Sequence, residues 1–325
     1  MLSANSQLHG PHRPMIKTTI GSVWGFSRRS QSWWIFFFLM SIFPGTGRSE
    51  YRENIEYGRA GDYSLRMDAS IPEGPGPFPA AIIVHGGAWV AGDRQRSVAP
   101  LFRPLSSHGF AWFSISYRLA SDISSSGFAA ALTLGTQIDD VRQAVACVKS
   151  HAAEYRVDPN RIVLIGESAG GQLAAMAGLK PWPALKPGTA LKSGADISVR
   201  AVVALYSPTD LATLASMSAM VPDSLRQAVK NSSLDALLMA GLKDLSPINW
   251  VRKDSPPFLL IHGTADRLVP FEQSKEMCKE MRLAGARCDL YAVDGGGHGI
   301  LWWEGVGLTG YKERMMSWLE KTLGS

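Results

Sequence analysis

The chain has 325 residues, a formal net charge of +5 and three cysteines, and 46% of its residues are hydrophobic. Residues 1–47 contain no acidic residue and hold four of the basic ones: Arg13, Lys17, Arg28 and Arg29. Residues 48–325 therefore carry a net charge of only +1, which excludes nucleic-acid binding driven by charge. Their length suits one α/β domain with a single large core.

The N-terminal segment has the pattern of an export signal. Its basic residues precede an apolar run over residues 33–43, which is too short to span a bilayer, since a spanning helix needs about 20 residues. Gly45 and Gly47 are small residues that suit a signal peptidase. We expect cleavage near Gly47 and a secreted or periplasmic protein without stable membrane insertion; the alternative is an uncleaved leader that serves as a membrane anchor.

Three early strands are predicted at residues 63–70, 80–84 and 110–117. The second runs into His85-Gly86-Gly87-Ala88-Trp89. Successive residues with small side chains let backbone N–H groups point at one spot, where they can hold a developing negative oxygen. We therefore expect Gly87 and Ala88 to donate to an oxyanion.

A serine follows the next strand. Apolar residues repeat on one face of a helix predicted at 136–154, and the short apolar run 162–165 leads into Gly166-Glu167-Ser168-Ala169-Gly170. A Gly-x-Ser-x-Gly turn between a strand and a helix presents the serine hydroxyl on a strained backbone. Ser168 is the predicted nucleophile, and Ala169 is the predicted third oxyanion donor.

Residues 200–206 read as a further strand, and residues 211–250 as an insertion. Helical patterns occur in the insertion at 224–230 and 233–242. We expect a small helical lid there. Strands that alternate with helices predict an α/β fold, with a mostly parallel twisted sheet flanked by helices.

The predicted acid follows the apolar run 258–262. Active groups of open α/β sheets gather at the carboxyl ends of strands, and Asp266 stands just beyond this one. The competitor is Asp294, but it lies only four residues from the predicted base, too close in the same turn to orient that histidine easily.

The predicted base is His298. A helix at 272–284 and a strand at 287–293 precede a glycine-rich turn that holds His298, and a helix at 311–323 follows. The other six histidines lie in the leader, in helices or next to strand ends, whereas a late loop histidine gives the chain order Ser, Asp, His of one large hydrolase class.

These motifs resemble the α/β-hydrolase family of carboxylesterases, and in particular bacterial enzymes of the acetyl-xylan and feruloyl esterase type. The resemblance runs from about residue 54 to the C-terminus. It implies an α/β-hydrolase domain over residues 48–325, an oxyanion hole from the His-Gly-Gly-x-Trp loop, and a triad of Ser168, Asp266 and His298. Ala88 departs from relatives that have a third glycine, and its methyl group is expected to narrow the acyl side.

The expected reaction is hydrolysis of a small-molecule ester, including acylated carbohydrates, without a cofactor. No motif for a metal or a nucleotide is evident in the sequence. An arylformamidase or a serine peptidase on the same fold, and a binding module that has lost catalysis, stay open as alternatives. Neither the natural ester nor the oligomeric state follows from the sequence.

Trp89, Trp302 and Trp303 are near the motifs in sequence and are candidate walls of the substrate cleft. Packing in the core is the alternative role for them. Of the three cysteines, Cys278 and Cys288 could pair in an oxidising compartment, although a helix and the next strand do not guarantee the separation that a disulfide needs.

Overall fold

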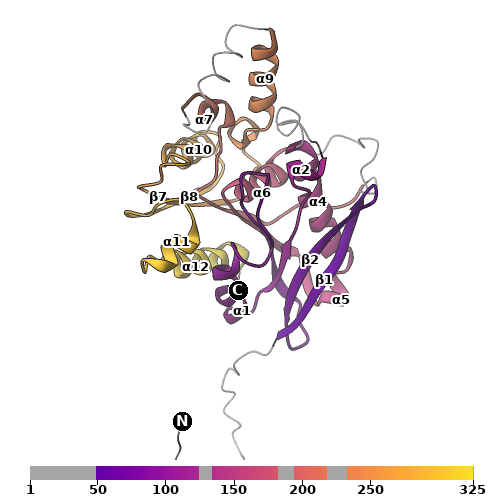
Figure 1. Ribbon diagram of the computed structural model, residues 1–325. Coiled ribbons are helices and arrows are strands. Elements are labelled where there is room, and N and C mark those ends of the chain that lie inside the picture. The colour runs from indigo at the N-terminus through magenta and orange to yellow at the C-terminus, as the bar shows by residue number, and fades with distance from the viewer. Residues whose placement is uncertain (1–48, 124–133, 182–193, 218–232, 325) are drawn as a thin grey trace, which may run out of the picture. The chain divides into compact units, whose positions relative to one another are not determined.

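The computed structural model describes residues 49–123, 134–181, 194–217 and 233–324 (Figure 1). The predicted leader and the predicted helix at 224–230 lie outside these residues. The core element is an eight-stranded sheet with the order β1-β2-β4-β3-β5-β6-β7-β8. Its strands are β1 (Ser49–Ala60), β2 (Tyr63–Pro72), β3 (Phe78–Val84), β4 (Ala111–Ile115), β5 (Val157–Glu167), β6 (Ala201–Leu205), β7 (Phe258–Gly263) and β8 (Cys288–Val293). β2 is antiparallel to both neighbours, and all other pairs are parallel.

The inner parallel strands β3, β5, β6 and β7 hold runs that are buried on both faces, which explains their continuous apolar sequences, whereas the edge strand β8 is partly exposed. In β5, Ile162 and Leu164 belong to one hydrophobic cluster, and Val163 and Ile165 belong to the other. Helices supply the opposing side chains of both clusters. The first face is covered by α4 (Leu134–Ser150), α6 (Ala169–Leu179) and α10 (Glu272–Leu283), and the second by α1 (Ala99–Ser107), α11 (Ile300–Gly305) and α12 (Tyr311–Leu323).

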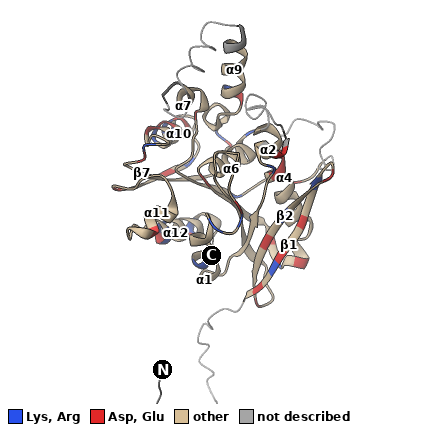
Figure 2. Ribbon diagram, viewed as in Figure 1, with Lys and Arg blue, Asp and Glu red and all other residues tan. Residues whose placement is uncertain are grey.

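The edge strand β1 was not among the predicted strands. Eight of its twelve residues are charged, polar or glycine, and its burial pattern contains a single buried residue, Tyr57. Arginine side chains occur among Asp and Glu side chains along β1 and β2 (Figure 2). Charges of both signs on an edge strand discourage pairing with another chain, but they also remove the apolar alternation by which a strand is recognised.

The helix predicted at 136–154 is two helices. α4 ends at Ser150, and α5 (Ala152–Tyr155) begins after His151, whose φ of −107° and ψ of 22° are not helical. The helix predicted at 233–242 is α9 (Ser233–Asp244). None of the helices in the described ranges combines the length and the apolar character that crossing a membrane requires.

The described ends of the insertion are fixed to the domain. α7 (Leu211–Met217) starts at Leu211, whose N–H donates to Ser246 Oγ at 2.8 Å. The carbonyl of Leu245 accepts from the side chain of Gln172 in α6 at 2.8 Å, and the short helix η1 (Pro247–Trp250) then leads back toward β7. The base of the insertion is therefore bound to the helix that follows Ser168.

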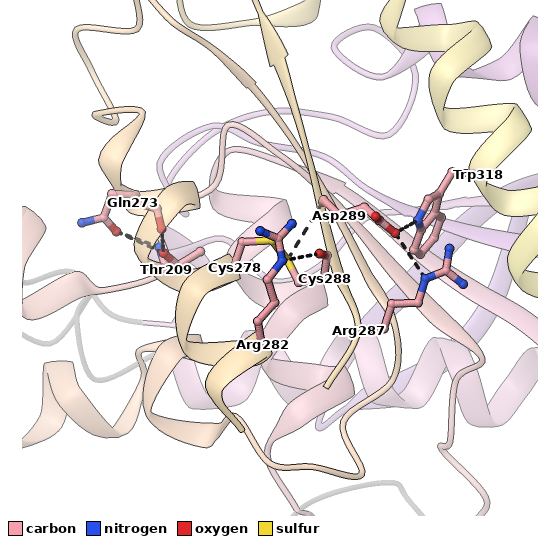
Figure 3. The surroundings of a disulfide bond; sticks show 8 residues. All are labelled: Thr209, Gln273, Cys278, Arg282, Arg287, Cys288, Asp289 and Trp318. Atoms are coloured by element: carbon pink, nitrogen blue, oxygen red, sulfur yellow. Dashed lines mark hydrogen bonds and ion pairs between the residues drawn. A yellow bond between two sulfur atoms is a disulfide. The ribbon is translucent and has the colours of Figure 1, made fainter. Parts of the chain in front are cut away.

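A disulfide joins Cys278 of α10 to Cys288 at the start of β8, with a Cα–Cα separation of 5.3 Å (Figure 3). The adjacent Arg282 Nε donates to the carbonyl of Cys288 at 3.0 Å. Five residues before Cys278, Gln273 Oε1 accepts from the N–H of Thr209 at 2.9 Å. The disulfide thus fixes a helix that also holds the loop after β6.

We expect this disulfide to protect two of the three thiols from alkylation. Denatured protein should show one reactive thiol, that of Cys147, before reduction and three afterwards, as counted by mass spectrometry. Replacing both Cys278 and Cys288 with serine should lower the free energy of unfolding by about 2–3 kcal/mol, because the unfolded chain regains the freedom of a loop of about ten residues. Three reactive thiols in unreduced protein would contradict the pairing.

Candidate active site

The segments that follow the parallel strands meet at one edge of the sheet, because parallel strands end on the same side. Ser168 follows β5, and Asp266 and His298 follow β7 and β8. The loop from His85 to Trp89 follows β3, the direct neighbour of β5. The topology therefore places all four predicted parts of the site at this edge.

Ser168 occupies a strained turn between β5 and α6. Its φ of 51° and ψ of −122° are rarely adopted by a residue with a side chain, and its N–H donates to the carbonyl of Leu205 at 2.9 Å. Gly170 makes this turn possible, since a Cβ there would overlap the carbonyl oxygens of Val84 and His85. The nucleophile turn is thereby packed against the end of β3, where the predicted oxyanion loop begins.

Ser168, His298 and Asp266 form one continuous hydrogen-bonded arrangement. His298 Nδ1 lies 2.7 Å from Asp266 Oδ2, and His298 Nε2 lies 2.9 Å from Ser168 Oγ. Because a carboxylate only accepts, the proton of the neutral imidazole is on Nδ1, which leaves Nε2 free to accept from the serine hydroxyl. This geometry permits Nε2 to remove the hydroxyl proton as Oγ attacks a carbonyl carbon.

The surroundings of Asp266 keep it ionised. Its Oδ1 accepts from the N–H groups of Leu268 and Val269, both at 2.9 Å. Burial acts to raise the pKa of the Asp266 carboxyl, but hydrogen bonds from His262, His298 and the Val269 backbone outweigh it and hold the pKa well below its usual range. The Asp266 carboxyl is consequently ionised and can accept the hydrogen bond from His298 Nδ1.

A second histidine, His262 at the end of β7, contacts the carboxylate of Asp266. It is fully buried, and its Nε2 lies 2.9 Å from the carbonyl of Val269 and 3.4 Å from Asp266 Oδ2. A carbonyl only accepts, so Nε2 carries the proton, and Nδ1 accepts from the hydroxyl of Ser274 in α10 at 2.7 Å. His262 therefore holds the loop that carries Asp266 in place through Val269 and links this loop to α10 through Ser274.

The predicted oxyanion loop has an unusual backbone. Gly87, Ala88 and Trp89 have φ values of 115°, 50° and 64°, a run of three positive values. Glycine is required at 87, since a Cβ there would overlap the carbonyl oxygen of Ala91. On the other side of the edge, Ala169 is the first residue of α6, and the first N–H groups of a helix have no partner within it. Both segments can offer backbone donors to an oxygen beside Ser168.

Two residues that contact parts of the predicted site at this edge were not predicted. Glu167, which precedes Ser168, accepts from the N–H of Gly86 and from the hydroxyl of Tyr206, both at 2.8 Å. Tyr206 follows β6, and its ring meets that of His298 at 4.8 Å between centroids. Together with His262, these residues all stand at the carboxyl end of a parallel strand, which is the signal that could have identified them.

The three tryptophans have different environments. Trp302 is 48% exposed and stands four residues after His298, so it is free to contact a substrate. Trp303 is fully buried, donates to the carbonyl of Gly297 at 2.7 Å and packs against Tyr206, so its prediction as a substrate contact is wrong. Trp89 is half-buried and donates from Nε1 to Gln172 Oε1 at 3.1 Å, which turns its polar edge toward α6.

Within the ranges that the structure describes, no group of three or more His, Cys, Asp or Glu side chains is arranged to hold a metal ion.

His85 is buried and stacks on Tyr117 at 4.4 Å between ring centroids, and burial lowers the pKa of its imidazole. Its Nδ1 lies 2.8 Å from the carbonyl of Gly86, which fixes the start of the predicted oxyanion loop.

Known esterases resemble the chain in sequence. It is 32% identical to the probable carboxylic ester hydrolase LipM and 34% identical to the esterase LipQ, both of Mycobacterium tuberculosis, over 73% and 77% of its own length. These matches cover 52% and 57% of the two relatives, so the chain spans about half the length of the curated relatives it matches.

Solved esterase structures share its fold. A truncated carbohydrate esterase from gut microbiota superposes with a TM-score of 0.67 at 29% identity, over 85% of this chain and 96% of that one. The thermophilic esterase Est2 of Thermogutta terrifontis gives a TM-score of 0.67 at 25% identity, over 84% and 92%. The model of the BD-FAE family matches residues 67–281, well over half of the chain. The chain therefore belongs to the BD-FAE family of α/β-hydrolase esterases.

Proposed function

We propose that the protein hydrolyses carboxylic esters through an acyl-enzyme formed on Ser168. The observation that carries the proposal is the unbroken contact from Asp266 through His298 to the hydroxyl of Ser168. A serine hydroxyl becomes a useful nucleophile at neutral pH only when a base of this kind accepts its proton. Membership of an esterase family and the names of the relatives support the same reaction class.

The proposed reaction has two similar halves. In the first, Ser168 Oγ attacks the ester carbonyl carbon, His298 takes the hydroxyl proton, and the backbone N–H groups of Gly87, Ala88 and Ala169 hold the negative oxygen. His298 then gives the proton to the leaving alcohol. In the second half, water attacks the acyl-enzyme with the same base, the acid leaves, and the serine is restored; Asp266 stabilises the imidazolium in both halves.

The test is a set of hydrolysis rates with the Ser168→Ala variant as the blank. Aryl esters, acetylated and feruloylated sugars, N-formylkynurenine and peptide anilides represent the proposed reaction and its alternatives. Serine-dependent hydrolysis of the esters alone supports the proposal. Faster turnover of N-formylkynurenine or of an anilide would replace it with an arylformamidase or a peptidase. Acylated sugars are the substrates we favour, because a carbohydrate esterase shares the fold at 29% identity.

Short acyl groups should be preferred. Ala88 is exposed and places a methyl group beside the proposed oxyanion donors, and we propose that the insertion at 211–250 acts as a small lid with limited apolar cover. Each methylene that finds room in a site contributes about 0.8 kcal/mol, whereas one that clashes costs binding. We expect kcat/KM to peak between acetyl and butyryl esters and to fall for octanoyl esters.

The matched variant is Ala88→Gly. Glycine adopts the φ of 50° at this position at lower conformational cost and removes the methyl group, so the acyl range should widen modestly. A maximum at long chains in the wild type would contradict the small-ester proposal.

We also propose that the protein is exported and that its leader is removed near Gly47. Expression of the full chain in a bacterial host should then yield a mature form that begins near Arg48, as read by N-terminal sequencing. A disulfide between Cys278 and Cys288 suits an oxidising compartment. Recovery of the intact leader in the membrane fraction would favour the anchor instead.

A further inference from the structure

A chain of hydrogen bonds runs beneath the proposed active site and joins its two sides. The N–H of Ile300, two residues after His298, donates to the hydroxyl oxygen of Tyr206 at 3.0 Å. That hydroxyl donates to Glu167 Oε2 at 2.8 Å, and Glu167 Oε1 accepts from the N–H of Gly86 at 2.8 Å. This chain of hydrogen bonds therefore starts in the loop that carries His298, called the histidine loop below. It passes through Glu167, the residue before Ser168, and ends at the oxyanion loop.

The directions of these bonds follow from the protonation of Tyr206. Its side chain is fully buried, and burial together with the negative charge of Glu167 raises the pKa of the phenol well above its usual value. The hydroxyl thus stays protonated and donates a hydrogen bond to the Glu167 carboxylate, and the oxygen lone pairs remain available to the N–H of Ile300. Each group in the chain has a defined role as donor or acceptor.

The backbone of Tyr206 is held in a conformation that residues with side chains rarely adopt. Its φ is 38°, and its N–H donates to the carbonyl of Ile261 at 2.7 Å. Such conformations persist only where the surroundings fix them, and they cluster at functional sites. The strained turn aims the ring at the imidazole of His298, with 4.8 Å between centroids and 68° between planes. Tyr206 thus contacts the histidine directly and the oxyanion loop through Glu167.

We infer that Tyr206 is a positioning residue which, through Glu167, sets the distance between the imidazole of His298 and the oxyanion donors around Ser168. The inference rests on the proposed function, because it assigns no chemistry of its own to either residue. Both halves of the proposed reaction need the base and the oxyanion donors together. Loss of these hydrogen bonds should therefore slow the attack of Ser168 on the ester more than it weakens substrate binding.

The test compares Tyr206→Phe with Tyr311→Phe in the full-length protein. Tyr311 is a matched control, because its ring is also fully buried, also packs on Trp303 and its hydroxyl also donates to a glutamate, Glu304, at 2.9 Å. Two rates are measured: kcat for a short aryl ester, and the rate at which a fluorophosphonate probe labels Ser168. We expect Tyr206→Phe to lower both about 10- to 100-fold with KM within about twofold, and Tyr311→Phe to change neither.

A double-variant comparison separates positioning from general loss of stability. Glu167→Gln alone should lower kcat about 10-fold, and Tyr206→Phe combined with Glu167→Gln should be no worse than the poorer single variant, because both break the same chain. Thermal unfolding records the stability of each variant. Equal rates for Tyr206→Phe and the wild type, or losses that follow the melting temperature in both tyrosine variants, overturn the inference.

The wild-type protein distinguishes the two possible failures. Labelling of Ser168 in the wild type that is lost in Ser168→Ala supports the proposed function independently of any chosen ester. If the wild type is not labelled, the proposed function fails and the inference falls with it. If the wild type is labelled and Tyr206→Phe is labelled equally fast, only the inference fails.

Discussion

Replacement of Ser168 with alanine is expected to lower kcat by about 10⁴- to 10⁶-fold, because no other group can take the place of the attacking oxygen. Its Oγ lies 2.9 Å from His298 Nε2, and the strained turn serves to present this one atom. The fold should be unaffected, since alanine keeps the Cβ and demands nothing new of the backbone. Circular dichroism and thermal unfolding of the variant check this point.

His298→Ala should cause a loss of the same size, and the double variant should be no slower than either single variant. Members of a triad act as a unit, so their losses do not add. His108 and His151 are suitable controls because both are exposed and lie outside the site, and their alanine variants should retain the wild-type rate. A Ser168→Ala variant that kept one tenth of the wild-type rate would remove Ser168 from the proposed mechanism.

The parallel strands and the triad geometry follow from strong local signals in the sequence. A parallel strand that is buried on both faces reads as a short apolar run, and the residue just beyond such a run stands at the edge where sites form. Ser168 and Asp266 each follow such a strand, whereas His298 follows the half-exposed edge strand β8 and was selected from its glycine-rich turn late in the sequence. Ser168 and His298 lie 130 residues apart. The structure brings all three within hydrogen-bonding distance.

Weaker local signals explain the elements that were not predicted. β1 is a charged edge strand whose pairing with β2 is not encoded in its own pattern. α11 has six residues, too few for a helical period to show. Trp302 and Trp303 are neighbours on this helix, so their side chains point about 100° apart, one toward solvent and one into the core. Sequence position alone could not tell which of the two was exposed.

Contacts between distant segments explain the missed residues of the site. Glu167 and Tyr206 are 39 residues apart, and their hydrogen bond depends on β5 and β6 being neighbours in the sheet. His262 reaches Asp266 only because the loop after β7 folds back. Each of these residues is unremarkable in its local sequence. What identifies them is the common edge of the sheet, once its strand order is known.

Replacement of Asp266 with asparagine is expected to lower kcat by about 10³- to 10⁴-fold. The carboxylate accepts the Nδ1 proton of His298 at 2.7 Å and so keeps Nε2 free for the proton of Ser168. An asparagine amide can donate to Nδ1 instead, which places the imidazole proton on Nε2 and blocks the base. Asparagine retains a carbonyl oxygen for the N–H groups of Leu268 and Val269, so the loop itself should stay folded.

The difference in stability between the wild type and Asp266→Asn should depend on pH in a defined direction. The pKa of Asp266 is depressed in the folded protein, so the ionised group stabilises the fold above the pKa of the unfolded state, about 3.9 for an ordinary aspartate. That contribution is lost as the pH falls through the folded-state pKa. The difference in unfolding free energy between the wild type and Asp266→Asn should therefore shrink as the pH is lowered below about 4, as measured by denaturant titration.

Asp294→Asn is the matched control for the identity of the acid. Asp294 is the same residue type in the histidine loop itself, but it is exposed, and its Oδ1 accepts from the hydroxyl of Thr264 at 3.3 Å. Its loss should leave kcat within about twofold of the wild type, since exposed hydrogen bonds of this length contribute little. The reverse outcome, with a crippled Asp294→Asn and a mild Asp266→Asn, would transfer the role of the acid to Asp294. It would also require the histidine loop to turn its carboxylate inward when substrate binds.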